Sequence, residues 1–287
     1  MLRATVPIAL AVCFILMLAA MAQAQSRDGN VLVKLSLLTE TTAMEAGRPL
    51  RVGILLNVEP GYHIYWINPG ESGQPPEVKW KLPEGFVAGD LQWPAPRRFV
   101  VPGGIVNFGY EGEVLLVATI TPTATAAVGR VELAAECSWL VCNDDVCLPG
   151  RGTATLKFGD AAQAAADRKR IEAAIASVPV PAEKSANVAR VNASDAAETR
   201  GVKIEWSGPV SQAEFFPLSY DGLKIVSTSV STNKRSNPPV TAIEIVAAPV
   251  TGSDRTATTV RGVLAYNDAE GRRLGIELSV PAKRVSP

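Results

Sequence analysis

The sequence has little histidine, little cysteine and no excess of charge of either sign. Among 287 residues there are one histidine, four cysteines, 28 basic and 28 acidic residues. One imidazole cannot build a three-histidine zinc site, and any Ser-His-Asp or Cys-His catalytic system would have to use His63. Nucleic-acid binders usually carry a basic excess that neutralises phosphates, and no dense Lys/Arg block occurs here. Most hydrolase classes and nucleic-acid binding are therefore disfavoured, and we expect neither a metal ion nor a cofactor.

Long hydrophobic runs are also absent after the amino-terminal segment, which has the layout of an export signal. Arg3 precedes an apolar run over residues 8–20, and Ala22-Gln23-Ala24 fits the small-x-small rule for cleavage. The run is too short to span a bilayer comfortably. We expect a cleaved signal peptide at residues 1–24, a periplasmic location and a mature chain without a transmembrane helix. Cys13 would leave with the signal, so three cysteines remain in an oxidising compartment.

Short alternating segments separated by glycine and proline make up most of the remaining chain, as in a β-sandwich. The composition changes once, at residues 160–177, which are rich in helix-forming residues and have Asp160 as an N-cap and Pro179 as a stop. Strand patterns resume after residue 200. The sequence therefore predicts an all-β protein with two sandwich domains, at residues 25–158 and 188–287, joined by an Ala-rich helix and linker at residues 159–187.

The three remaining cysteines, Cys137, Cys142 and Cys147, lie within eleven positions of one another. Cys142 and Cys147 flank a four-residue, mostly polar turn, so they can lie opposite each other in a hairpin. Opposed Cα atoms of an antiparallel pair are about 4.5 to 5.5 Å apart, which suits a disulfide. Cys137 is at an odd offset from Cys142 and points to the other face of a regular strand. The spacing predicts a Cys142–Cys147 bridge and a buried or spare thiol at Cys137.

Such a bridge can be a structural staple of an exported domain or a redox site. It closes only a small loop, so its entropic contribution is small, and a domain of this size does not need it, which favours redox use. Asp144 and Asp145 are good turn residues, and their charge would also disfavour thiolates. A zinc or copper site on three thiols is a third alternative. It is disfavoured because histidine ligands are missing and because Cys137 points to the other face of the strand.

A second cluster contains Tyr62, His63 and Tyr65 and is followed by a Gly/Pro-rich stretch at residues 68–73. These aromatic residues can form a docking or shielding surface, or divide between the core and the rim of a strand. His63 has no visible catalytic partner. We interpret it as a surface or hydrogen-bonding residue that can assist thiol chemistry.

Four segments in this order resemble the amino-terminal periplasmic domain of the DsbD and ScsB thiol:disulfide interchange proteins. They are residues 60–73, 92–96, 108–114 and 139–149. The resemblance extends over about residues 30–158, and Phe215-Phe216-Pro217 is similar to the additional immunoglobulin-like domain of the ScsB type. It implies an immunoglobulin-like fold with one redox-active pair, Cys142 and Cys147.

The same resemblance implies roles for individual residues. Cys147 would form mixed disulfides with partners and Cys142 would resolve them, as in a protein-disulfide reductase. An aromatic residue on a loop would shield the bridge, and Phe99, in the stretch before Pro102-Gly103-Gly104, is the candidate. The partners would be periplasmic thioredoxin-like oxidoreductases.

The chain departs from the family because no transmembrane bundle and no Cys-x-x-Cys thioredoxin-like domain follow, so electrons would come from a separate membrane protein. The alternative is a non-catalytic binding module, in envelope protein maturation or copper tolerance, in which the bridge is a staple.

Overall fold

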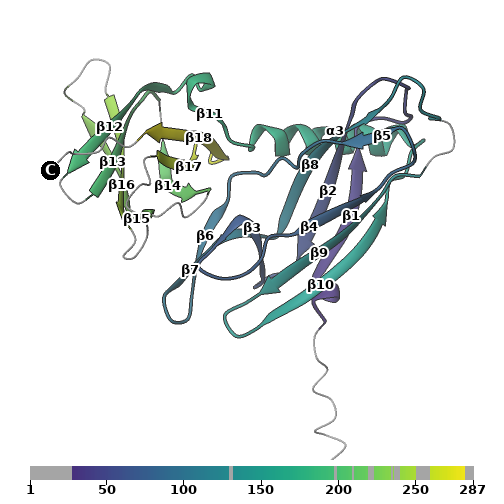
Figure 1. Ribbon diagram of the computed structural model, residues 1–287, viewed down its shortest axis with the longest axis horizontal. Helices are drawn as coiled ribbons and strands as arrows, with labels where there is room; N and C mark the ends of the chain where they lie inside the picture. Colours follow the sequence, from purple (N-terminus) through teal and green to yellow (C-terminus); the bar gives the residue numbers. More distant parts are fainter. Residues whose placement is uncertain are drawn as a thin grey trace, which may run out of the picture.

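The computed structural model describes residues 28–128, 132–196, 199–208, 210–218, 223–233, 235, 240–249 and 259–281. The expected signal peptide, residues 1–24, lies outside them. Within the described ranges the chain forms two β-sandwiches with the helix α3 (Ala161–Ala176) between them (Figure 1). The all-β, two-sandwich fold is thus confirmed. None of the helices in this part of the chain is long and apolar enough to cross a membrane.

The first sandwich contains two sheets, preceded by the short helix α2 (Gly29–Leu32). One sheet consists of β1 (Val33–Thr39), β2 (Leu50–Val58), β5 (Phe86–Ala88) and β8 (Glu113–Pro122). The other consists of β3 (His63–Gly70), β4 (Glu77–Lys81), β6 (Arg97–Val101), β7 (Ile105–Glu111), β9 (Ala134–Cys142) and β10 (Cys147–Thr155). The strand orders are β1-β2-β8-β5 and β10-β9-β3-β7-β6, with β4 paired to β9. This order puts β3 between the cysteine hairpin β9–β10 and the hairpin β6–β7.

Helix α3 covers the outer face of the first sheet, which explains why β2 and β8 do not alternate between apolar and polar residues. Ile54 of β2 points into the sandwich core, whereas Leu55 packs outward against Ile171 of α3. Both faces of these central strands are therefore buried. The helix has the expected N-cap, since the side chain of Asp160 accepts a hydrogen bond from the Gln163 N–H at 3.0 Å.

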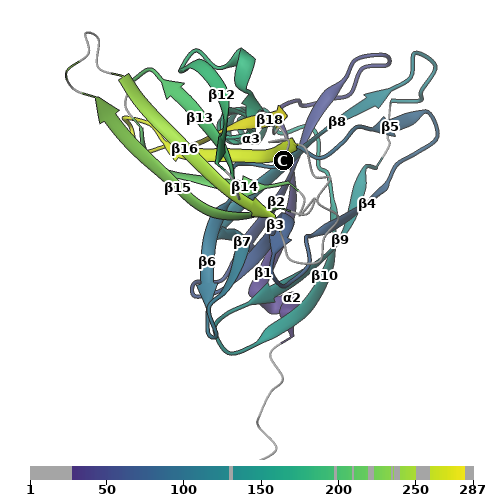
Figure 2. The same cartoon turned by 60° about the vertical axis from the view of Figure 1, so that its left-hand side comes forward.

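The second sandwich contains two sheets as well, each with four strands within the described residues. One has the order β11-β18-β17-β14, formed by β11 (Val180–Pro181), β18 (Arg273–Pro281), β17 (Thr259–Asn267) and β14 (Ser211–Pro217). The other has the order β12-β13-β16-β15, formed by β12 (Val188–Ala196), β13 (Thr199–Trp206), β16 (Val240–Pro249) and β15 (Leu223–Asn233). Figure 2 shows the two sheets face to face. Trp206 and Tyr266 meet edge to face in the core between them, 4.5 Å apart between ring centres.

The Gly/Pro-rich stretch at residues 68–73 begins inside a strand. Strand β3 includes Asn68 and Pro69 and continues to Gly70. The pairing of β3 with β7 shifts in register between Tyr65 and Gly70. Such an irregularity accommodates the proline, which cannot donate to a regular ladder.

Candidate redox site

Cys142 and Cys147 form a disulfide at the tip of the β9–β10 hairpin. The two residues are opposed in the antiparallel register, with their Cα atoms 4.1 Å apart. The turn between them is closed by a hydrogen bond from the Asn143 N–H to the Val146 carbonyl, and the Asn143 side chain accepts from two further turn amides. The predicted pairing is confirmed. Its cause is local, because a hairpin register fixes both ends of the bridge.

The two cysteines differ in their access to solvent. Cys142 is 1% exposed, because it pairs with Cys147 on one side and with His63 of β3 on the other. Cys147 begins the edge strand β10 and is exposed. An incoming thiolate can therefore reach the bridge from the Cys147 side, and its attack there would leave the electron pair on Cys142.

Tyr65 supplies a hydrogen-bond donor to the bridge. Its hydroxyl lies 2.9 Å from the Cys142 Sγ, to which it donates, and 3.8 Å from the Cys147 Sγ. Burial raises the pKa of Tyr65 above its ordinary value, and a hydrogen bond with Ser72 lowers it in part. The hydroxyl therefore keeps its proton at neutral pH. The side chain is buried, which agrees with the alternative that assigns these aromatic residues to the core of a strand.

The packing behind the Tyr65 ring comes from a turn that the sequence did not assign to the site. Gly73 has φ +93°, and a Cβ added there would lie 2.1 Å from Cε1 of Tyr65. The Ser72 N–H and hydroxyl both donate to the Asn107 Oδ1, at 3.2 and 2.9 Å. The glycines at positions 70 and 73 were the only sequence signal for this close approach.

His63 is buried because β3 lies between two other strands, so of the two alternatives considered for it, a surface or a hydrogen-bonding residue, the surface position does not hold. Its ring stacks on Phe99, with centres 4.6 Å apart and planes 13° apart, and meets Tyr65 edge to face at 5.3 Å. Burial lowers the pKa of His63 below its ordinary value, and the charges of Asp144 and Glu111 offset part of this effect. His63 is therefore neutral at pH 7, and its Nε2 has no hydrogen-bond partner among the described residues.

The other candidate residues divide between surface and core. Phe99 is half-buried and lies in strand β6, not in a loop, and the loop proper is the turn at residues 102–104. Asp144 and Asp145 are exposed in the cysteine turn. Tyr62 is buried in the core of the first sandwich, so it does not contribute to a docking surface.

Cys137 is a free, fully buried thiol in the same core. Burial, with a smaller contribution from the charge of Glu136, raises the pKa of Cys137 to about 12. The thiol is protonated at neutral pH and does not compete in exchange, as expected for a spare cysteine. Among the described residues, no group of three or more His, Cys, Asp and Glu side chains is placed to hold a metal ion.

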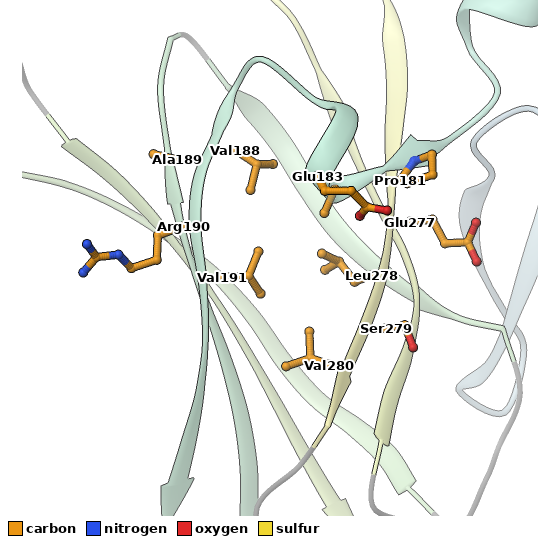
Figure 3. Close-up of a pocket in the computed structure, with 11 residues that line it drawn as sticks. Pro181, Glu183, Val188, Ala189, Arg190, Val191, Glu277, Leu278, Ser279 and Val280 are labelled. Carbon is orange, nitrogen blue, oxygen red and sulfur yellow. The ribbon is translucent and has the colours of Figure 1, made fainter.

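A cavity of about 620 Å³ opens in the second sandwich between the edge strand β12 and strand β18, beside the short β11. Figure 3 shows Val188, Val191, Leu278 and Val280 facing one another there, while Arg190 points away. None of its lining residues comes from β3, β9 or β10. The cavity is therefore separate from the cystine, which lies at a surface hairpin.

Comparisons with known proteins agree with this geometry. A family model described as "Thiol:disulfide interchange protein DsbD, N-terminal" matches residues 34–158. No curated protein matches the chain.

The solved structures that match include two domains of this type. The N-terminal periplasmic domain of ScsB from Proteus mirabilis has 17% identity and a TM-score of 0.59, over 88% of this chain and 92% of that one. The N-terminal domain of Neisseria meningitidis DsbD in the reduced form has 14% identity and a TM-score of 0.30, over 45% of this chain and 88% of that one. The ScsB likeness shows that the two-sandwich fold is shared across nearly the whole chain. Residues 34–158, which contain the cystine, match the family of DsbD-type N-terminal domains of thiol:disulfide interchange proteins.

Proposed function

We propose that this protein passes electron pairs through Cys142 and Cys147 to or from thioredoxin-like oxidoreductases. The observation that carries the proposal is the asymmetry of the cystine. An exposed Cys147 is bonded to a buried Cys142 whose sulfur accepts a hydrogen bond from Tyr65 at 2.9 Å. A staple has no need of a hydroxyl donor aimed at one of its sulfurs.

In this proposal each sulfur has a distinct role in exchange. A partner thiolate attacks the Cys147 Sγ, the Cys142–Cys147 bond breaks, and the electron pair goes to the Cys142 Sγ. The Tyr65 hydroxyl stabilises the thiolate that develops there. A second thiol of the partner then attacks the partner sulfur that is bonded to Cys147, and Cys147 leaves as a thiolate. The partner leaves oxidised and the chain holds two reduced cysteines.

In the opposite direction the reduced Cys147 attacks the disulfide of an oxidised partner. Cys142 then attacks Cys147 in the mixed disulfide and releases the partner as a dithiol. Asp144 and Asp145 are exposed beside the pair, and their negative charge disfavours thiolates in the free protein. Reaction with small oxidants is therefore slow, and exchange depends on a docked partner. The stacked rings of Phe99 and His63 are our candidate shield for the Cys142 side of the bridge.

The matched family and the ScsB domain, which is described as periplasmic, support a periplasmic location. We propose that residues 1–24 are the export signal and that residues 25–158, 159–187 and 188–287 are the redox domain, the linker and the second domain. We also propose a membrane protein as the electron donor.

Electron transfer between two purified proteins tests this function. The full chain is reduced, freed of reductant and mixed with an equimolar thioredoxin-like oxidoreductase from the same envelope in its disulfide form. We expect two thiols to disappear from this chain and two to appear on the partner, with the Cys142–Cys147 bridge restored, as read by alkylation and mass spectrometry. A Cys142→Ser/Cys147→Ser variant is the control. If thiols do not move between the proteins although their potentials allow it, the bridge is a staple in a binding module.

A further inference from the structure

The second sandwich contributes a side chain to the core of the first. Phe216 of β14 is 1% exposed and meets Trp66 and Phe108 edge to face, with ring centres 6.3 and 5.1 Å apart. Trp66 lies on β3, the strand that carries His63 and Tyr65, and Phe108 lies on the neighbouring β7. The guanidinium of Arg273 on β18 lies over the Phe216 ring and donates hydrogen bonds to the Pro96 carbonyl next to the first sandwich. The two sandwiches therefore share a packed interface.

Asn68 of β3 joins this interface to the turn behind Tyr65. Its side chain is buried, and its Nδ2 donates to the carbonyl of Pro217 in the second sandwich at 2.7 Å. Its Oδ1 accepts from the Gly70 N–H at 3.1 Å. Both ends of the amide are satisfied, as a buried polar group requires. One side chain thus fixes the start of the turn relative to the second sandwich.

The turn continues from Gly70 to the Tyr65 ring. At Gly70, φ is +94° and an added Cβ would lie 2.4 Å from the Val106 carbonyl oxygen, so the backbone passes tightly over β7. The Glu71 N–H donates to the same carbonyl at 2.8 Å. Gly73 then packs directly on Tyr65. A shift of Gly70 would move the surface against which the Tyr65 ring rests.

We propose that Asn68 is a positioning residue for the redox site, through which docking of the second sandwich holds the Tyr65 hydroxyl on the Cys142 sulfur. This inference rests on the proposed function and deepens it, since it assigns the second sandwich a part in the exchange reaction. The side-chain hydrogen bonds of Asn68 go to Pro217 and Gly70 and not to either sulfur. Its effect passes through the turn and Tyr65.

The test measures the rate at which dithiothreitol reduces the bridge in the full-length protein. In this reaction one thiolate of dithiothreitol attacks Cys147 and its second thiol closes the cyclic disulfide, so the protein gains the electron pair as two thiols. Tyr65→Phe is expected to slow the reduction about ten-fold, the effect of one hydrogen bond to a charged group. Asn68→Ala, which keeps the hydroxyl but loosens its support, is expected to slow it about three- to ten-fold.

A double-mutant cycle distinguishes positioning from a general structural role. In a Tyr65→Phe background, Asn68→Ala is expected to change the rate by less than about two-fold, because the donor that it positions is gone. Phe216→Leu keeps the core apolar but loosens the packing next to Pro217, whose carbonyl holds Asn68. It is expected to slow reduction when the Tyr65 hydroxyl is present and to change the rate by less than about two-fold in the Tyr65→Phe background. Equal slowing by either variant with and without the Tyr65 hydroxyl would overturn the proposal.

Arg273→Gln is the matched control. It weakens the same interface, and the hydrogen bonds of Arg273 go neither to Asn68 nor to the turn at residues 70–73. Its rate is expected to stay within about two-fold of the unmodified protein, and slowing as large as that of Asn68→Ala would mean that the interface acts as a whole. Because the reductant is dithiothreitol, the result is independent of any protein partner. Coupling between Asn68 and Tyr65 without transfer to an oxidoreductase contradicts only the proposed function, and transfer without coupling contradicts only the role of Asn68.

Discussion

Cys142→Ser is expected to collect covalent adducts with envelope proteins, whereas Cys147→Ser is expected to collect far fewer. The first variant keeps the exposed nucleophile Cys147, which attacks a partner disulfide. It lacks the buried thiol that would release the partner from this chain, so the mixed disulfide persists. The second variant keeps only Cys142, which is 1% exposed and beyond the reach of a bulky partner.

Purification of each variant from its native envelope, followed by a diagonal gel without and then with reductant, measures this difference. The doubly substituted chain, Cys142→Ser/Cys147→Ser, controls for adducts through Cys137, whose pKa of about 12 makes it a poor nucleophile. Equal trapping by both single variants, or stronger trapping by Cys147→Ser, would contradict the assignment of attacking and resolving sulfurs. The trapped proteins would also identify the donor or the client.

Gly73→Ala is expected to cause a large loss of stability and to disturb the packing of Tyr65 at the bridge. The residue has φ +93°, and the added methyl would lie 2.1 Å from the Tyr65 ring. Backbone strain and overpacking together are expected to cost about 2 to 4 kcal/mol of unfolding free energy. The ring must also move, so reduction of the bridge by dithiothreitol is expected to slow with it. Denaturant unfolding and the reduction rate are both measured on the full chain.

Gly103→Ala is the matched control for this prediction. Its φ is +88°, so the backbone strain is comparable, but an added Cβ would have no atom within 4 Å. We expect it to cost about 1 kcal/mol and to leave the reduction rate unchanged. If the two variants are equally destabilised and equally fast, the turn at residues 70–73 does not press on Tyr65.

The cysteine pairing could be predicted from the sequence because it depends on local geometry. Five positions and a polar turn determine which residues of a hairpin are opposed, and the odd offset of Cys137 excludes it from the pair. The helix was predictable for the same reason, since Asp160 and Pro179 bound it within one segment. Both features needed no knowledge of distant strands.

The surroundings of the bridge could not be predicted, because they depend on strands far apart in the sequence. Tyr65 reaches Cys142 across 77 positions, and His63 is buried only because β3 pairs between β9 and β7. Asn68 lies in the Gly/Pro-rich stretch of the sequence, and Pro217, whose carbonyl accepts its hydrogen bond, is 149 positions away. The β-propensity of single residues does not predict these contacts, because tertiary packing outweighs propensity in strands.

The reduction potential of the Cys142–Cys147 pair tests most directly the claim that the bridge is a relay. The full chain is equilibrated with glutathione buffers of known ratio and the fraction of reduced protein is determined by alkylation. A relay is expected to lie among the catalytic couples, between about −180 and −270 mV. A value below about −300 mV, typical of structural disulfides, would contradict the account and leave the bridge as a staple.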